Sequence, residues 1–121
     1  MILVDTSIWA DHFAKTIAGL SELIAGDEVL QHPFVTGELA LGNPTDRSAM
    51  IATLQSLPQA EVHEPCELLT FAGRHDLGGT GIGYVDAHLL ASAHAHGARL
   101  WSKDKRLARQ AERLALAYEP Q

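Results

Sequence analysis

Ile2-Leu3-Val4-Asp5-Thr6-Ser7, near the start of the 121-residue chain, indicates how the molecule is built. Three apolar residues, two of them β-branched, predict a short buried strand. An acidic residue closes the run, and Thr6 or Ser7 can cap a following helix. The chain therefore opens with a strand-to-helix unit that places Asp5 at the carboxyl end of the strand.

The same alternation continues along the chain. Apolar spacing, together with proline and glycine punctuation, predicts helices over residues 16–25, 33–41, 46–57, 65–77, 84–96 and 104–114. Short apolar runs predict strands over residues 28–30, 60–63, 98–102 and 116–118. Strands that alternate with longer helices predict an α/β fold, with a short, mainly parallel β-sheet sandwiched by helices. The length fits one domain, residues 1–121.

Four carboxylates lie where these predicted elements end or begin: Asp5, Glu38, Asp86 and Asp104. Asp5 and Asp104 follow strands, and sites in parallel sheets form at the carboxyl ends of strands. Glu38 and Asp86 lie on helices that can lean over the same edge. Carboxylates repel one another, so a hard divalent cation, Mg²⁺ or Mn²⁺, is the usual reason for gathering them. Such an ion points to phosphate chemistry.

Each of these acids also has a purely structural interpretation. Asp5 can serve only as a helix N-cap, and Asp86 and Asp104 can be first-turn residues stabilised by the helix dipole. Glu38 is harder to explain in this way, because it is a lone charge in an otherwise apolar helix. The metal site therefore depends on whether all four side chains meet.

Charge is unevenly distributed along the chain, whose formal net charge is -6. Residues 1–98 hold three Lys/Arg and twelve Asp/Glu, a net of -9, and residues 99–121 hold six Lys/Arg and three Asp/Glu, a net of +3. Lys103, Lys105 and Arg106 lie beside the last acidic candidate and can hold an RNA backbone. A solvated helix face is the alternative for these cations.

Composition limits the other possibilities. One cysteine, Cys66, excludes an internal disulfide and is unremarkable in a reducing compartment. The first residues lack the basic and apolar regions of a signal peptide, and no apolar run approaches the length of a membrane helix. We therefore expect a cytoplasmic protein with no membrane partner.

Four motifs together resemble those of PIN-domain ribonucleases, and most closely the VapC-type toxins of bacterial toxin–antitoxin pairs. They are Val-Asp-Thr-Ser at 4–7, Gly-Glu-Leu-Ala-Leu-Gly at 37–42, Tyr-Val-Asp-Ala-His-Leu-Leu-Ala at 84–91 and Leu-Trp-Ser-Lys-Asp at 100–104. The resemblance covers nearly the whole chain and implies a Mg²⁺- or Mn²⁺-dependent endoribonuclease. By that likeness Asp5, Glu38, Asp86 and Asp104 form the acidic site. Thr6 and Ser102 match hydroxyl positions that support it, with serine standing where threonine is usual.

The resemblance also implies a reaction and partners. A metal-activated water would hydrolyse an RNA phosphodiester, leaving a 5′-phosphate and a 3′-hydroxyl. A small antitoxin protein would hold the toxin, as a hetero-oligomer or around a homodimer, and could direct a basic side chain toward the acids. Trp9, Phe13 and the stripe Met50, Ile51, Leu54 and Leu57 are expected in the core, with a dimer face or an antitoxin groove as the alternative.

Two other functions fit parts of the sequence. A Mg²⁺-binding phosphoacceptor signalling module also has an acidic first strand end and a late lysine, here Lys103. That module needs an acidic pair after the first strand and an aspartate after the third, and this chain has neither. An inactive PIN-like scaffold that only binds a partner is the second alternative, and the intact acidic quartet argues against it.

Overall fold

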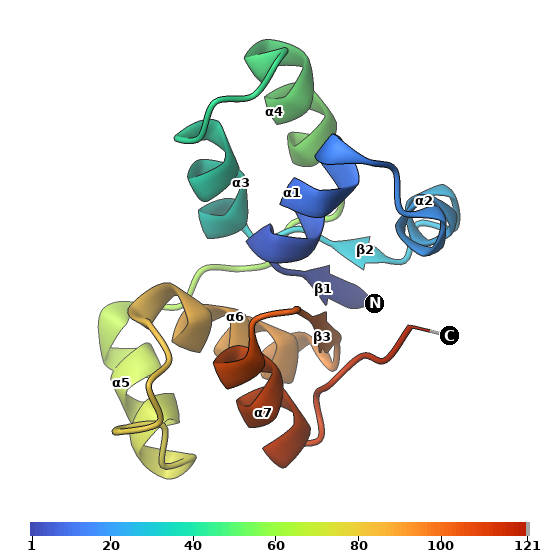
Figure 1. Ribbon diagram of the computed structural model, residues 1–121. Helices are drawn as coiled ribbons and strands as arrows, with labels where there is room; N and C mark the ends of the chain where they lie inside the picture. Colours follow the sequence, from blue (N-terminus) through green and yellow to red (C-terminus); the bar gives the residue numbers. More distant parts are fainter. Residues whose placement is uncertain (121) are drawn as a thin grey trace.

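The computed structural model describes residues 1–120. Their helices and three of the predicted strands follow one another in the predicted order (Figure 1). In chain order these are β1 (Ile2–Val4), α1 (Thr6–Ala14), α2 (Ala18–Ala25), β2 (Val29–Leu30), α3 (Pro33–Ala40), α4 (Arg47–Gln55), α5 (Pro65–Arg74), α6 (Tyr84–His96), β3 (Arg99–Trp101) and α7 (Lys105–Arg113).

The sheet has the order β2-β1-β3, and both strand pairs are parallel. Leu3 pairs with Leu30 on one side and with Leu100 on the other. The ladder between β1 and β3 continues to the strand ends, where the Asp5 amide donates to the Trp101 carbonyl over 2.9 Å. The residues after β1 and after β3 therefore leave the sheet side by side, which brings Asp5 close to the β3–α7 turn.

Two predicted strands are absent from residues 1–120. The segment 60–63 forms no strand, and one isolated bridge, between Gln31 and Gln59, lies just before it. Beyond that bridge, α6 side chains occupy the backbone groups that a strand would use, because the Glu61 amide donates to His96 and the Glu61 carbonyl accepts from Ser92. The segment 116–118 forms a single bridge, between Leu100 and Ala117. The prediction of two further strands is wrong.

Several helix ends differ from the predicted ones by a few residues, whereas α6 has its predicted bounds. Helix α1 is capped by Asp5, whose side chain accepts from the Thr6 amide, so neither predicted hydroxyl residue is the cap. Helix α5 ends at Arg74, three residues early. After it, Asp76 adopts a φ of 53°, and the Leu77 amide donates a hydrogen bond to the Ala72 carbonyl.

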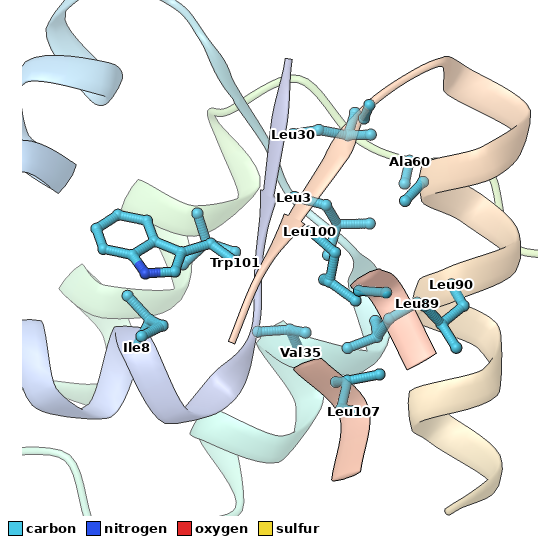
Figure 2. Close-up of a cluster of buried hydrophobic side chains, with 14 of the residues drawn as sticks. Leu3, Ile8, Leu30, Val35, Ala60, Leu89, Leu90, Leu100, Trp101 and Leu107 are labelled. Atoms are coloured by element: carbon cyan, nitrogen blue, oxygen red, sulfur yellow. The ribbon is translucent and has the colours of Figure 1, made fainter. Parts of the chain in front are cut away.

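Helices cover the sheet on both sides. Figure 1 shows α1, α3 and α4 on one side and α5, α6 and α7 on the other. Figure 2 shows the strand alternation that builds this core: Leu3 and Leu100 point toward α6, whereas Trp101 lies on the opposite side with Ile8. Burying one leucine side chain stabilises the fold by about 1.5–3 kcal/mol. This packing holds the strand ends, and the acids that follow them, in place.

The predicted α/β class and parallel sheet are confirmed by this topology. None of the helices within residues 1–120 is long and apolar enough to cross a membrane.

Candidate active site

Asp5 is buried at the carboxyl end of β1, with 6% of its surface exposed. Three donors hold its carboxylate. Oδ1 accepts from the Thr6 amide at 2.7 Å, and Oδ2 accepts from the hydroxyls of Ser7 at 2.9 Å and Ser102 at 2.7 Å. Charge-assisted bonds of this kind are stronger than neutral ones and fix the carboxylate in one orientation.

Ser102 joins Asp5 to the second acid of the sheet edge. Its hydroxyl donates to Asp5 and accepts from the Asp104 amide at 3.0 Å. Asp104 is exposed, and its Oδ1 accepts from the amides of Arg106 and Leu107 at the start of α7. Asp104 is therefore the N-cap of α7 rather than the first-turn residue of its structural interpretation, and it is also hydrogen-bonded into the group around Asp5.

Thr6 joins Asp5 to the third acid. The Thr6 hydroxyl donates to Glu38 Oε1 over 2.7 Å, while the Thr6 amide donates to Asp5. Helix α3 buries Val35 and Leu39 and leaves Glu38 exposed. The argument that Glu38 is poorly placed in an apolar helix is therefore too strong, because the side chain faces outward.

Asp86 is the fourth acid, at the third position of α6, where its Oδ2 accepts from the Gly83 amide at 3.3 Å. Burial raises the pKa of the Asp86 carboxyl above its ordinary value, and the Gly83 bond opposes that rise. The negative charges of Asp5, Asp104 and Glu38 raise the pKa further. Asp86 thus lies close enough to acids from three other parts of the chain for their charges to act on it.

These four carboxylates supply only oxygen donors, which suits Mg²⁺ or Mn²⁺. As the side chains stand, however, no group of three or more His, Cys, Asp or Glu among residues 1–120 could hold a metal ion. Each carboxylate is turned toward a hydroxyl or amide donor instead. Glu38 and Asp104 are exposed and Asp86 is half-buried, so their side chains have room to rotate. The donor set therefore fits such an ion once these side chains turn toward it.

The basic residues near the acids are not equally available. Lys103 contacts both carboxylate oxygens of Asp11, at 2.7 and 2.8 Å, in the one ion pair found within residues 1–120. Lys105 and Arg106 are exposed on α7, and neither forms an ion pair within residues 1–120. Arg99 is committed to the sheet end, where it donates to the Ala117 carbonyl. Lys105 and Arg106 are thus the free cations nearest the acids in sequence.

A cleft of about 680 Å³ lies beside Thr6 and Glu38, between α1, α3 and α4. Phe13 and Met50 line it, and the turn at residues 42–46 completes its wall. Phe13 is 46% exposed, so its predicted place in the core is wrong, whereas Leu54, from the predicted stripe on α4, is fully buried. Sequence spacing placed both on apolar faces but could not tell a core face from a cleft wall.

Sequence reasoning also missed two groups that act on the acids. Ser7 contacts Asp5 through its hydroxyl and accepts from the Lys103 amide at 3.3 Å. The Gly83 amide contacts Asp86. The signal for Ser7 was its position two residues after Asp5, where it could be read only as a helix cap. The glycine-rich segment before Asp86 gave no sign that one of its amides would be used.

The family model described as PIN domain matches residues 2–113. The chain belongs to the PIN-domain family. Within that family it is similar to ribonuclease VapC32 from two strains of Mycobacterium tuberculosis, each 48% identical over 108 residues, covering 88% of this PIN domain chain and 87% of the relative. The expected place among VapC-type PIN domains is thereby confirmed.

Two solved structures share the PIN-domain fold described above. PAE2754 from Pyrobaculum aerophilum has a TM-score of 0.60 and 21% identity, and the match covers 94% of this chain and 88% of that one. FitAcB from Neisseria gonorrhoeae has a TM-score of 0.62 and 20% identity, over 93% of this chain and 94% of that one. The match to the PIN-domain model also argues against the alternative function, a phosphoacceptor signalling module.

Proposed function

We propose that this PIN-domain protein is a metal-dependent endoribonuclease and that it is the toxin of a VapBC-type toxin–antitoxin pair, acting on RNA in the cytoplasm. The observation that carries the proposal is the gathering of acids at the sheet edge, where Ser102 joins Asp5 to Asp104 and Thr6 joins Asp5 to Glu38. The charges of these three acids also contribute to the raised pKa of the half-buried Asp86 carboxyl, after burial itself. The 48% identity to a relative named as a ribonuclease supports the reaction class.

In this proposal the four carboxylates hold Mg²⁺ or Mn²⁺. When bound, the ion would lower the pKa of a water and stabilise charge on the phosphate oxygens. The chain's own contribution is to orient Asp5 through Ser7 and Ser102 and to keep Glu38 close by through Thr6, from which Glu38 would turn to reach the ion. Burial and the charges of the other three acids disfavour the ionised form of Asp86, which raises its pKa. A bound cation would favour that ionised form.

The cations of α7 give the RNA backbone a place to bind. Lys105 and Arg106 lie one and two residues after Asp104, so a phosphate bound to them would lie near the acids. Lys103 can join them when RNA phosphate replaces its exposed partner Asp11. These contacts carry no base specificity, and the RNA target is set by other contacts.

The cleft lined by Phe13 and Met50 supports the antitoxin part of the proposal. Its wall is mainly apolar, and it opens next to Glu38. A partner segment with apolar side chains for the cleft and a basic side chain for the acids would match both features. The partner would thereby cover the acidic group and block RNA, in a hetero-oligomer or around a homodimer.

The test is cleavage of total cellular RNA by the purified chain. We expect cleavage with Mg²⁺ or Mn²⁺, products with 5′-phosphate and 3′-hydroxyl ends, and no cleavage when EDTA removes the metal. The Asp5→Asn variant should lose at least about a hundredfold in rate, whereas Glu22→Gln, an exposed acid on α2, should not. Equal cleavage by the wild type and Asp5→Asn would identify the chain as an inactive scaffold with a contaminating nuclease.

A further inference from the structure

Tyr84 is a large aromatic residue on the surface beside the acidic group. It is the first residue of α6, two positions before Asp86, and 56% of its surface is exposed. No hydrogen bond to another residue among 1–120 involves its hydroxyl. A single exposed aromatic needs no explanation by itself, so the argument rests on how this one is held and what surrounds it.

A column of rings holds Tyr84 from below. Its ring meets that of buried His88 at 4.7 Å between centroids and 82° between planes. His88 in turn packs edge to face against Phe34 at 4.9 Å, and Phe34 contacts buried His32 at 4.9 Å. Edge-to-face pairs of this kind are stabilising and directional. The column therefore sets the orientation of the Tyr84 ring while more than half of the residue stays open.

Tyr84 lies near the acidic group because it shares the first turn of α6 with Asp86. The charges of Asp5, Asp104 and Glu38 all act on Asp86, so this end of α6 faces the other acids. Residues four apart on a helix share one side, and Tyr84 lies on the side of α6 that carries His88. Tyr84 is thus held at the end of α6 that borders the acidic group.

The segment just before Tyr84 connects it to Arg106 of α7. Gly81 has a φ of 87°, and a Cβ there would lie 3.2 Å from Arg106 Cδ, so the glycine backbone rests directly on the arginine side chain. Ile82 packs against the core, and Gly83, next to Tyr84, is exposed and carries no side chain. A short segment therefore links the exposed ring to a surface guanidinium.

We propose that Tyr84 stacks on an unpaired base of the RNA substrate, beside the phosphate that the acidic group receives. The inference rests on the ribonuclease function proposed above and adds the residue that binds a base. Aromatic side chains bind splayed-out bases, whereas bases inside a duplex have both faces covered by their neighbours. Tyr84 then covers one base, with Arg106 available to the backbone beside it.

The experiment measures binding of a labelled oligoadenylate and of an abasic oligoribonucleotide of equal length. All chains carry Asp86→Asn so that the RNA stays intact. We expect Tyr84→Ala and Tyr84→Leu to weaken oligoadenylate binding about five- to a hundredfold and to leave abasic binding unchanged. Tyr84→Phe and Tyr84→Trp should retain binding. Leu69→Ala, which removes another exposed apolar side chain, on α5, is the matched control.

Salt dependence separates stacking from a loss of structure or charge. Tyr84→Ala should lower affinity equally at every salt concentration, because stacking releases no counterions, whereas Arg106→Ala should reduce the salt slope. The inference is overturned if Tyr84→Ala weakens abasic and oligoadenylate binding alike, or if wild-type affinity does not depend on the bases. Metal-dependent cleavage is measured separately on the unmodified chain, so neither result decides whether the proposed ribonuclease function is correct.

Discussion

Ser102 and Asp5, 97 positions apart in the chain, are joined by a hydrogen bond of 2.7 Å from the serine hydroxyl to the carboxylate. The same hydroxyl accepts from the Asp104 amide, so it has one orientation. A single side chain thus links the ends of β1 and β3 and positions the two acids that follow them.

Removing that hydroxyl should weaken both the fold and the metal site. Ser102→Ala should lower the free energy of unfolding by about 1 kcal/mol and weaken Mn²⁺ binding about tenfold or more, because Asp5 loses one of its donors. Ser102→Thr should retain both. Denaturant unfolding and calorimetric titration measure the two effects. The control is Ser56→Ala, whose hydroxyl bonds only to its own helix; identical behaviour of the two alanine variants would contradict the assigned role.

Neutralising Asp86 should stabilise the metal-free protein. Its pKa is raised on folding, so the folded state holds the proton more tightly, and stability is lost as pH rises from the ordinary value of 3.8 through the raised one. Asp86→Asn removes the repulsion and should raise the melting temperature at neutral pH while abolishing the further stabilisation that Mn²⁺ gives. Glu22→Gln should change neither quantity. A metal-induced shift of normal size in Asp86→Asn would exclude Asp86 as a ligand.

His32 should make the protein sensitive to acid. Burial, together with the nearby charges of His88 and His63, lowers the pKa of the His32 imidazole from 6.5 to about 4. The unfolded state therefore binds more protons between these values, and stability should fall by roughly 3 kcal/mol as pH drops through that window. His32→Asn keeps an acceptor at the α3 cap and should flatten the pH profile. Denaturant unfolding across this pH range measures the effect, and an unchanged profile in His32→Asn would contradict it.

The basic residues of α7 should account for the salt dependence of RNA binding. Lys105→Ala and Arg106→Ala should each reduce the slope of log affinity against log salt by about 1, whereas Arg74→Ala, an exposed cation on α5, should not change it. Asp11→Asn should strengthen binding, because it releases Lys103 from its ion pair. Filter binding across a salt series checks all four variants. Unchanged slopes in both α7 variants would show that RNA binds elsewhere.

Local sequence signals predicted most of the fold, because they act over a few residues. Pro33 begins α3 and Gly97 follows the last residue of α6, both as predicted, and the apolar run at residues 2–4 forms the central strand. The predicted strands at 60–63 and 116–118 failed for a non-local reason. Whether a short extended segment forms a strand depends on which groups face it, and Ser92 and His96 of α6 face Glu61.

The candidate site divides in the same way. Spacing indicated which acids to consider, since Asp5 and Asp104 follow strands that proved adjacent. It could not reveal the donors that hold them, because Ser102 reaches Asp5 across the sheet and Thr6 reaches Glu38 across two helices. Nor could it show that Lys103 is paired with Asp11, 92 positions away. Such contacts arise only from the folded arrangement.

The most direct test of the account is Mn²⁺ binding to the RNA-free chain, followed by electron paramagnetic resonance of the free ion. The account predicts saturable Mn²⁺ binding by the wild type. Because the carboxylates at the sheet edge bind the ion together, binding should be strongly weakened in Asp5→Asn and Asp86→Asn but not in Glu22→Gln. Undiminished binding by both aspartate variants, or no binding by the wild type, would contradict it.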